Sequence, residues 1–119
     1  MPIGKARILA VLAASALGLG VLAANSVAAT SLSLKSVGAC CKYDKKALVA
    51  KAGKITITFT NNSGPVKHDV AIKGNKKSAQ ITGGKSTKLT VTLKKGTYTF
   101  YCTVPGHEAA GMKGVLKVT

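Results

Sequence analysis

From residue 30 onward, the chain alternates apolar and polar residues with a period of two, the pattern of half-buried β-strands. The segment KITITFT (54–60) places its isoleucines and phenylalanine on one face and its threonines on the other. The same alternation recurs in KLTVTL (88–93) and GTYTFYC (96–102). We expect strands at 31–37, 47–52, 54–60, 68–74, 78–82, 88–93, 96–102 and 114–119.

Short turns rich in Gly, Asn and Lys separate these segments, for example at 61–65 and 83–84. The same region contains no amphipathic helix of normal length, no low-complexity linker and no internal repeat. About eight short strands in about 90 residues predict an all-β fold, a sandwich or a barrel, in a single domain.

The first 29 residues have the features of a secretory signal. Lys5 and Arg7 form a short basic region, residues 8–24 are apolar, and small residues precede a cleavage point after residue 29. The apolar run is marginal for a membrane span, so an uncleaved N-terminal anchor is the alternative. We therefore expect a signal segment or anchor at 1–29 and an exported domain at 30–119, periplasmic or extracellular and membrane-associated if the anchor is kept.

The exported domain is strongly basic. It has 16 Lys and no Arg against three acidic residues, which leaves a net charge of +13. Most of these lysines are expected to form a solvated surface, and acidic proteins or anionic lipid surfaces are the expected counterparts. Nucleic acid is not an expected partner, because Lys lacks the bidentate fork of Arg and the five aromatic residues do not alternate with a basic stripe.

The segment YCTVPGHEAAGM (101–112) gathers three residues that bind soft metals. Four residues separate Cys102 from His107, and four more separate His107 from Met112. The chain has only two histidines, and its other methionine is the initiator. We expect the tight loop at 103–106 to return His107 to the neighbourhood of Cys102, and a second short loop to bring Met112 up before the last strand.

The other histidine, His68, supplies the fourth candidate ligand. Strand parity places His68 and Cys102 on apolar faces, where imidazole nitrogens need partners. Two imidazoles and a thiolate in a trigonal array, with a weak axial thioether, make a blue-copper electron-transfer site. Each residue alone has an ordinary role in packing, but together they fit one copper ion that cycles between Cu(I) and Cu(II). Zinc needs no Met and prefers more Cys or a carboxylate, and a binuclear copper centre needs two cysteines in this loop.

Three cysteines are an odd number for an exported chain. Metal ligation would protect the isolated Cys102 in an oxidising compartment. Cys40 and Cys41 are adjacent, which makes a bond between them strained, and we expect Cys41 to face the core beside a partly exposed Cys40. The segment 37–40 faintly resembles a lipobox, but lipidation there would remove the predicted first strand.

Together with FTNNSGPVKHDVAI (59–72), the segment 101–112 closely resembles the cupredoxins, small type 1 copper proteins. The resemblance covers nearly all of 30–119 and implies a cupredoxin-like Greek-key β-sandwich of about seven to eight strands. The C-x4-H-x4-M spacing is more similar to auracyanin- and sulfocyanin-type members than to plastocyanin, whose Cys-to-His gap is shorter. By this resemblance, the copper ligands are His68, Cys102, His107 and Met112.

Two positions qualify the resemblance. Asp69 stands where the family often has Asn, and the resemblance implies that its backbone N–H lies near the cysteine sulfur. The vicinal pair Cys40–Cys41 is a departure, since members usually carry no cysteine pair there.

The function predicted is that of a monomeric one-electron carrier between redox proteins, and not of an enzyme, because every strong ligand position of a single copper would be filled. The alternative is a copper chaperone or store in the periplasm. A third hypothesis, from a different class, is a metal-free, Lys-rich adhesion or membrane-surface module.

Overall fold

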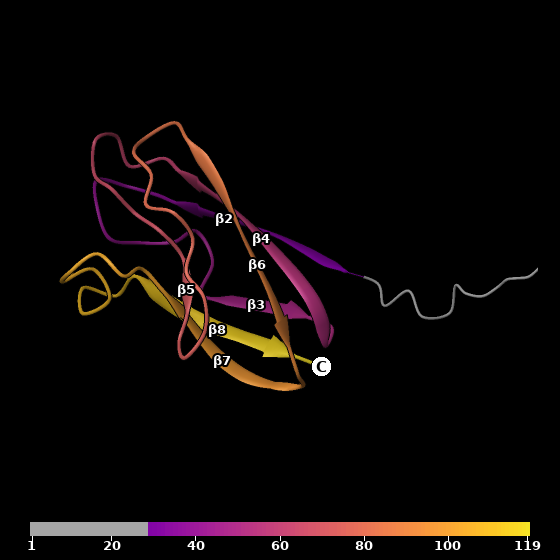
Figure 1. Cartoon of the computed structure of the whole chain (residues 1–119). Helices are drawn as coiled ribbons and strands as arrows, with labels where there is room; N and C mark the ends of the chain where they lie inside the picture. The colour runs from indigo at the N-terminus through magenta and orange to yellow at the C-terminus, as the bar shows by residue number, and fades with distance from the viewer. Residues whose placement is uncertain (1–28) are drawn as a thin grey trace, which may run out of the picture.

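The structure, a computed structural model, describes residues 29–119, so the predicted signal segment or anchor lies outside the described residues. Within this range we find no helix with the length and apolar character needed to cross a bilayer. The described residues form seven strands in two sheets (Figure 1). The strands are β2 (Thr30–Ser36), β3 (Ala47–Ala50), β4 (Gly53–Asn61), β5 (Ala71–Ile72), β6 (Ser86–Leu93), β7 (Gly96–Tyr101) and β8 (Lys113–Val118).

The two sheets form the predicted sandwich. One has the order β2–β4–β6, in which β2 runs parallel and β6 antiparallel to β4. The other has the order β3–β8–β7–β5, in which β3 is parallel to β8 and the remaining pairs are antiparallel. In Figure 1 the loop between β7 and β8 extends from the left end of the sandwich, opposite the C-terminus.

The predicted alternation sets the core. In β4, Ile55, Ile57 and Phe59 are fully buried, and the alternate residues of β6 face the same interior. Between the sheets, the ring of Tyr43 lies 5.7 Å from that of Phe59 and 5.5 Å from that of Phe100. Because these rings come from β4, β7 and the loop after β2, they join both sheets into one core.

The predicted strand at 78–82 was wrong, and the one at 68–74 shrinks to the two residues of β5. His68 and Ile81 exchange backbone hydrogen bonds of 3.1 and 2.9 Å, but only as an isolated bridge. The N–H of Val70 donates to the hydroxyl of Ser78 at 3.1 Å. A side-chain oxygen thus replaces a backbone carbonyl, and the ladder does not continue.

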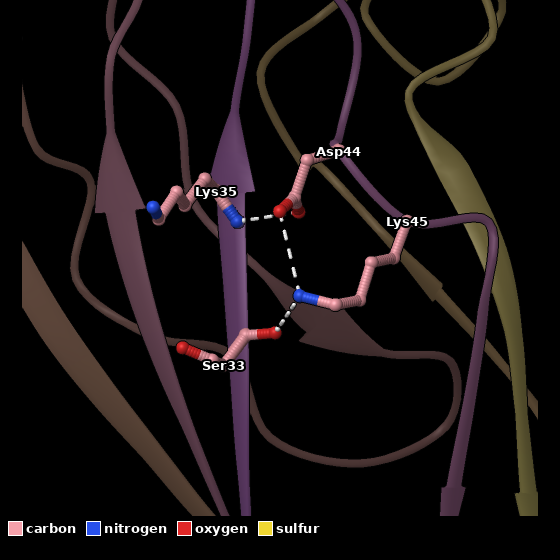
Figure 2. Close-up of polar contacts among 4 residues, drawn as sticks. All are labelled: Ser33, Lys35, Asp44 and Lys45. Atoms are coloured by element: carbon pink, nitrogen blue, oxygen red, sulfur yellow. Dashed lines mark hydrogen bonds and ion pairs between the residues drawn. The ribbon is translucent and has the colours of Figure 1, made fainter.

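The loop after β2 is attached firmly to that strand, as Figure 2 shows. The backbone N–H of Lys35 donates to the carboxylate of Asp44 at 2.9 Å. The ammonium of Lys45 donates to the carbonyl of Ser33 at 2.9 Å and lies 3.4 Å from the same carboxylate. These contacts fix the base of the loop 37–42, which carries the two adjacent cysteines.

Candidate metal centre

Three of the four predicted ligands converge at one end of the sandwich. The Nδ1 atoms of His68 and His107 are 3.2 Å apart. The sulfur of Cys102 lies 3.6 Å from Nδ1 of His107 and 3.9 Å from Nδ1 of His68. A triangle with these sides has a centre about 2 Å from all three atoms, close to the length of metal–nitrogen and metal–sulfur bonds. The donors therefore fit a single metal ion.

Two strand ends and the loop between them position these residues. Cys102 directly follows β7, and Met112 directly precedes β8. The N–H of Cys102 donates to the carbonyl of Met112 at 3.1 Å, and the N–H of Met112 donates to the carbonyl of His107 at 3.0 Å. The Met112 side chain is fully buried. The loop thus closes on itself and carries Cys102, His107 and Met112 to the same end, as the spacing predicts.

His68 enters the site from the other side. Its bridge to Ile81 fixes the backbone, and the side chain is fully buried. Burial lowers the pKa of His68, and the neighbouring His107 lowers it further, whereas Asp69 acts in the opposite direction. The neutral imidazole, which is the form that binds metals, is therefore favoured.

The thiol of Cys102 is almost completely buried, and burial raises its pKa. The nearby backbone N–H groups of Asp69 and Val104 act to lower the pKa of the thiol, whereas the Asp69 carboxylate acts to raise it. This effect agrees with the expected place of the Asp69 N–H near the cysteine sulfur. Donors near a metal-binding sulfur orient it and adjust its electron density.

The carboxylate of Asp69 has a role that the sequence did not reveal. It is buried and accepts hydrogen bonds from the backbone N–H of Thr103, at 2.7 Å, and from the Thr103 hydroxyl. The hydroxyl of Tyr43 donates to the backbone carbonyl of Asp69 at 2.5 Å. Asp69 therefore ties the His68 segment to the loop that follows Cys102. Its position next to a candidate ligand was the only signal available.

Asn61, expected in the turn 61–65, has a structural role that its sequence context does not reveal. It ends β4 and is fully buried. Its side-chain oxygen accepts from the hydroxyl of Ser36 at 3.0 Å and from the N–H of Ser63 at 2.8 Å. Its amide donates to the carbonyls of Val66, at 2.8 Å, and Ile81, at 2.6 Å. Asn61 thus holds both the segment that leads into His68 and the residue bridged to it.

The two adjacent cysteines lie beside this site. A disulfide joins Cys40 to Cys41, and Cys102 is a free, buried cysteine. Cys41 is half-buried and packs against the core while Cys40 is exposed, as expected. Donor atoms of Cys40, Cys41 and His107 all lie within 4.8 Å of one another. No pattern in the sequence predicts that the cysteine pair lies this close to His107.

The chain belongs to the plastocyanin/azurin family of copper-binding proteins, which matches residues 30–119. Auracyanin-B of Chloroflexus aurantiacus is 49% identical over 43 residues, a match that spans 35% of this chain and 18% of that protein. Dithionite-reduced auracyanin of Roseiflexus castenholzii superposes with a TM-score of 0.71 at 30% identity, over 76% of this chain and 97% of that one. For auracyanin A of C. aurantiacus, a "blue" copper protein, the TM-score is 0.69 at 26% identity, over 77% and 100%.

The cupredoxin resemblance and the all-β fold are therefore confirmed, and copper is the metal of this family. A pair of imidazoles and a thiolate is a donor set that suits copper in both oxidation states.

Proposed function

We propose that the chain is an exported one-electron carrier in which His68, Cys102, His107 and Met112 hold a single copper ion. The observation that supports this most directly is the closed triangle of two Nδ1 atoms and one sulfur, with sides of 3.2, 3.6 and 3.9 Å. When bound, copper supplies a one-electron couple. The buried Met112, hydrogen-bonded through its backbone to Cys102, would supply its thioether as the weakest of the four donors.

The proposed site is mostly buried, and His107 is the most exposed of its four candidate ligands. His68, Cys102 and Met112 are buried, whereas His107 is half-buried and follows the exposed Pro105 and Gly106. The imidazole of His107 is therefore the proposed path of the electron to a redox partner docked at this end. The proposed ligand set fills every strong position, which disfavours catalysis on a substrate. The carrier is proposed to act as a monomer.

A copper chaperone or store, the alternative function, differs from a carrier in whether the bound copper is kept or released. A carrier keeps its copper while the oxidation state cycles, whereas a chaperone passes Cu(I) to an acceptor. Repeated reduction and oxidation in the presence of a Cu(I) chelator separates the two. A carrier retains its copper through the cycles.

The ligand assignment is tested with the visible spectrum of the copper-loaded protein. Cys102→Ser should abolish the intense absorption, because that band requires charge transfer from the thiolate to copper. Cys40→Ser/Cys41→Ser is the matched control and should keep the colour. Colour that survives in Cys102→Ser would refute the assignment.

Met112→Gln should retain copper but lower the reduction potential measured by voltammetry, because the thioether is a poor ligand for Cu(II).

A further inference from the structure

The proposed electron carrier leaves the pair Cys40–Cys41 without a role. Among the described residues, two groups of metal-binding side chains have donor atoms close enough to share an ion. One is His68, Cys102 and His107, and the other is Cys40, Cys41 and His107, again with all donor atoms within 4.8 Å of one another. The first group is largely buried, and the second lies nearer the surface, with Cys40 exposed. His107 belongs to both.

Backbone hydrogen bonds, in addition to the disulfide, hold the loop that carries Cys40 and Cys41. The N–H of Val37 donates to the carbonyl of Lys42 at 2.9 Å, and the N–H of Lys42 donates to that of Cys40 at 3.0 Å. Ser36 and Tyr43 form a β-bridge at the base of the loop, below which lie the contacts of Figure 2. Cleavage of the S–S bond would therefore leave the backbone of both cysteines in place, within side-chain reach of His107.

We propose that the reduced pair Cys40–Cys41 forms, with His107, a second metal site that accepts Cu(I) at the mouth of the buried centre. A dithiol reductant supplies two electrons and two protons to the disulfide, which becomes two thiols, and the reductant is left as a disulfide. Cu(I) then displaces the two thiol protons and binds two thiolates and one imidazole. Thiolate-rich, low-coordinate sets select Cu(I) over harder cations.

The shared histidine suggests what such a site does. A neutral imidazole has a single lone pair for a metal, so His107 serves one of the two sites at a time. Exchange of Cys40 and Cys41 for Cys102 and His68, with His107 kept or rebound, moves Cu(I) inward without any change in oxidation state. A disulfide oxidant then takes two electrons and two protons from the emptied pair and is left as a dithiol, and the restored Cys40–Cys41 bond removes the outer site. The proposal concerns how copper is acquired and does not depend on electron transfer by the loaded centre.

The test uses Cu(I) delivered as its bicinchoninate complex under anaerobic conditions. In a Cys102→Ser background, the chain treated with a phosphine reductant should take one Cu(I) from the chelator. Its affinity should be higher, by about 10-fold or more, than that of the oxidised chain or of the reduced Cys40→Ser/Cys41→Ser/Cys102→Ser chain. Adding His107→Ala to the reduced background should cause a comparable loss. Circular dichroism establishes that each variant is folded.

A second measurement leaves the buried centre intact. The reductant-treated, metal-free wild-type chain and the equally treated Cys40→Ser/Cys41→Ser variant are each mixed with the Cu(I)–bicinchoninate complex. Copper uptake is followed as the loss of the colour of that complex. Uptake should be faster in the wild type by about 10-fold or more. Equal rates, or equal affinities in the first measurement, would overturn the proposal while leaving the blue colour and reversible redox cycle of the loaded wild type, and thus the carrier function, untouched.

Discussion

Asn61 joins the segments that place His68 in the site. All four of its hydrogen-bonding positions are used, and its partners lie in β2, in the turn after β4, just before His68, and at Ile81. A buried amide satisfied in this way fixes the relative position of the segments that it joins. Its removal leaves buried donors and acceptors without partners, which is costly in free energy.

Asn61→Ala should therefore lower the free energy of unfolding of the metal-free protein by about 2–4 kcal/mol in urea titrations. The neighbouring Asn62 is exposed, and its side chain makes no hydrogen bond in the described part of the chain. Asn62→Ala is thus a matched control that should change stability by less than about 0.5 kcal/mol. Similar losses in the two variants would contradict the role given to Asn61.

The candidate metal ligands could be predicted from the sequence, whereas the residues that hold them in place could not. Cys102, His107 and Met112 could be recognised because they are chemically rare in this chain and evenly spaced. Asn61 and the Asp69 carboxylate could not, because their partners are mostly distant in sequence, and an Asn beside Gly and Pro has the pattern of an ordinary turn. Long-range hydrogen bonds leave no periodic signal.

At the scale of elements, the alternation of threonines with large apolar residues in β4 and β6 was sufficient to predict both strands and their buried faces. The prediction of a strand at 78–82 was wrong, because the hydroxyl of Ser78 accepts the hydrogen bond from Val70 that a backbone carbonyl would accept in a strand. The sheet order and the parallel pairings of β2 and β3 were also beyond reach, since nothing local specifies them.

Strand β8 packs closely at Gly114 against the Phe100 side chain and the Lys46 backbone, which can be tested by substitution. A Cβ atom added to Gly114 would overlap the ring of Phe100 and lie 2.6 Å from the carbonyl oxygen of Lys46. That carbonyl is fixed because it accepts the N–H of Val115 at 2.9 Å. Gly114→Ala should therefore destabilise the protein by about 1–3 kcal/mol through overpacking.

The exposed Lys113 on the same strand provides the control for this measurement. Lys113→Ala should leave the urea midpoint nearly unchanged. If Gly114→Ala proved equally harmless, β8 would have to pack less closely on β7 and the Lys46 backbone than the structure indicates.

At the scale of the whole molecule, charge is the dominant property. Sixteen lysines lie within the described residues, and the two ion pairs found there are Lys45–Asp44 and Lys73–Glu108. Asp69 is buried and hydrogen-bonded to Thr103, so it does not neutralise the surface. A large excess of positive charge is left to act on whatever approaches from solution.

This charge should guide acidic redox partners to the protein. Exposed charges are screened over about 8 Å at physiological ionic strength. In stopped-flow reduction of the copper-loaded protein, the association rate with an acidic donor should therefore fall by about 10-fold or more as salt rises, while the electron-transfer step inside the complex should barely change.

Attraction to anionic lipid would weaken with salt in the same way, so salt alone does not separate steering of redox partners from lipid attachment. Soluble acidic and basic donors, compared at low salt without membranes, do separate them. If the basic donor reacts as fast as the acidic one, the lysines do not steer electron-transfer partners, and attachment to anionic lipid or solubility becomes the better explanation for them.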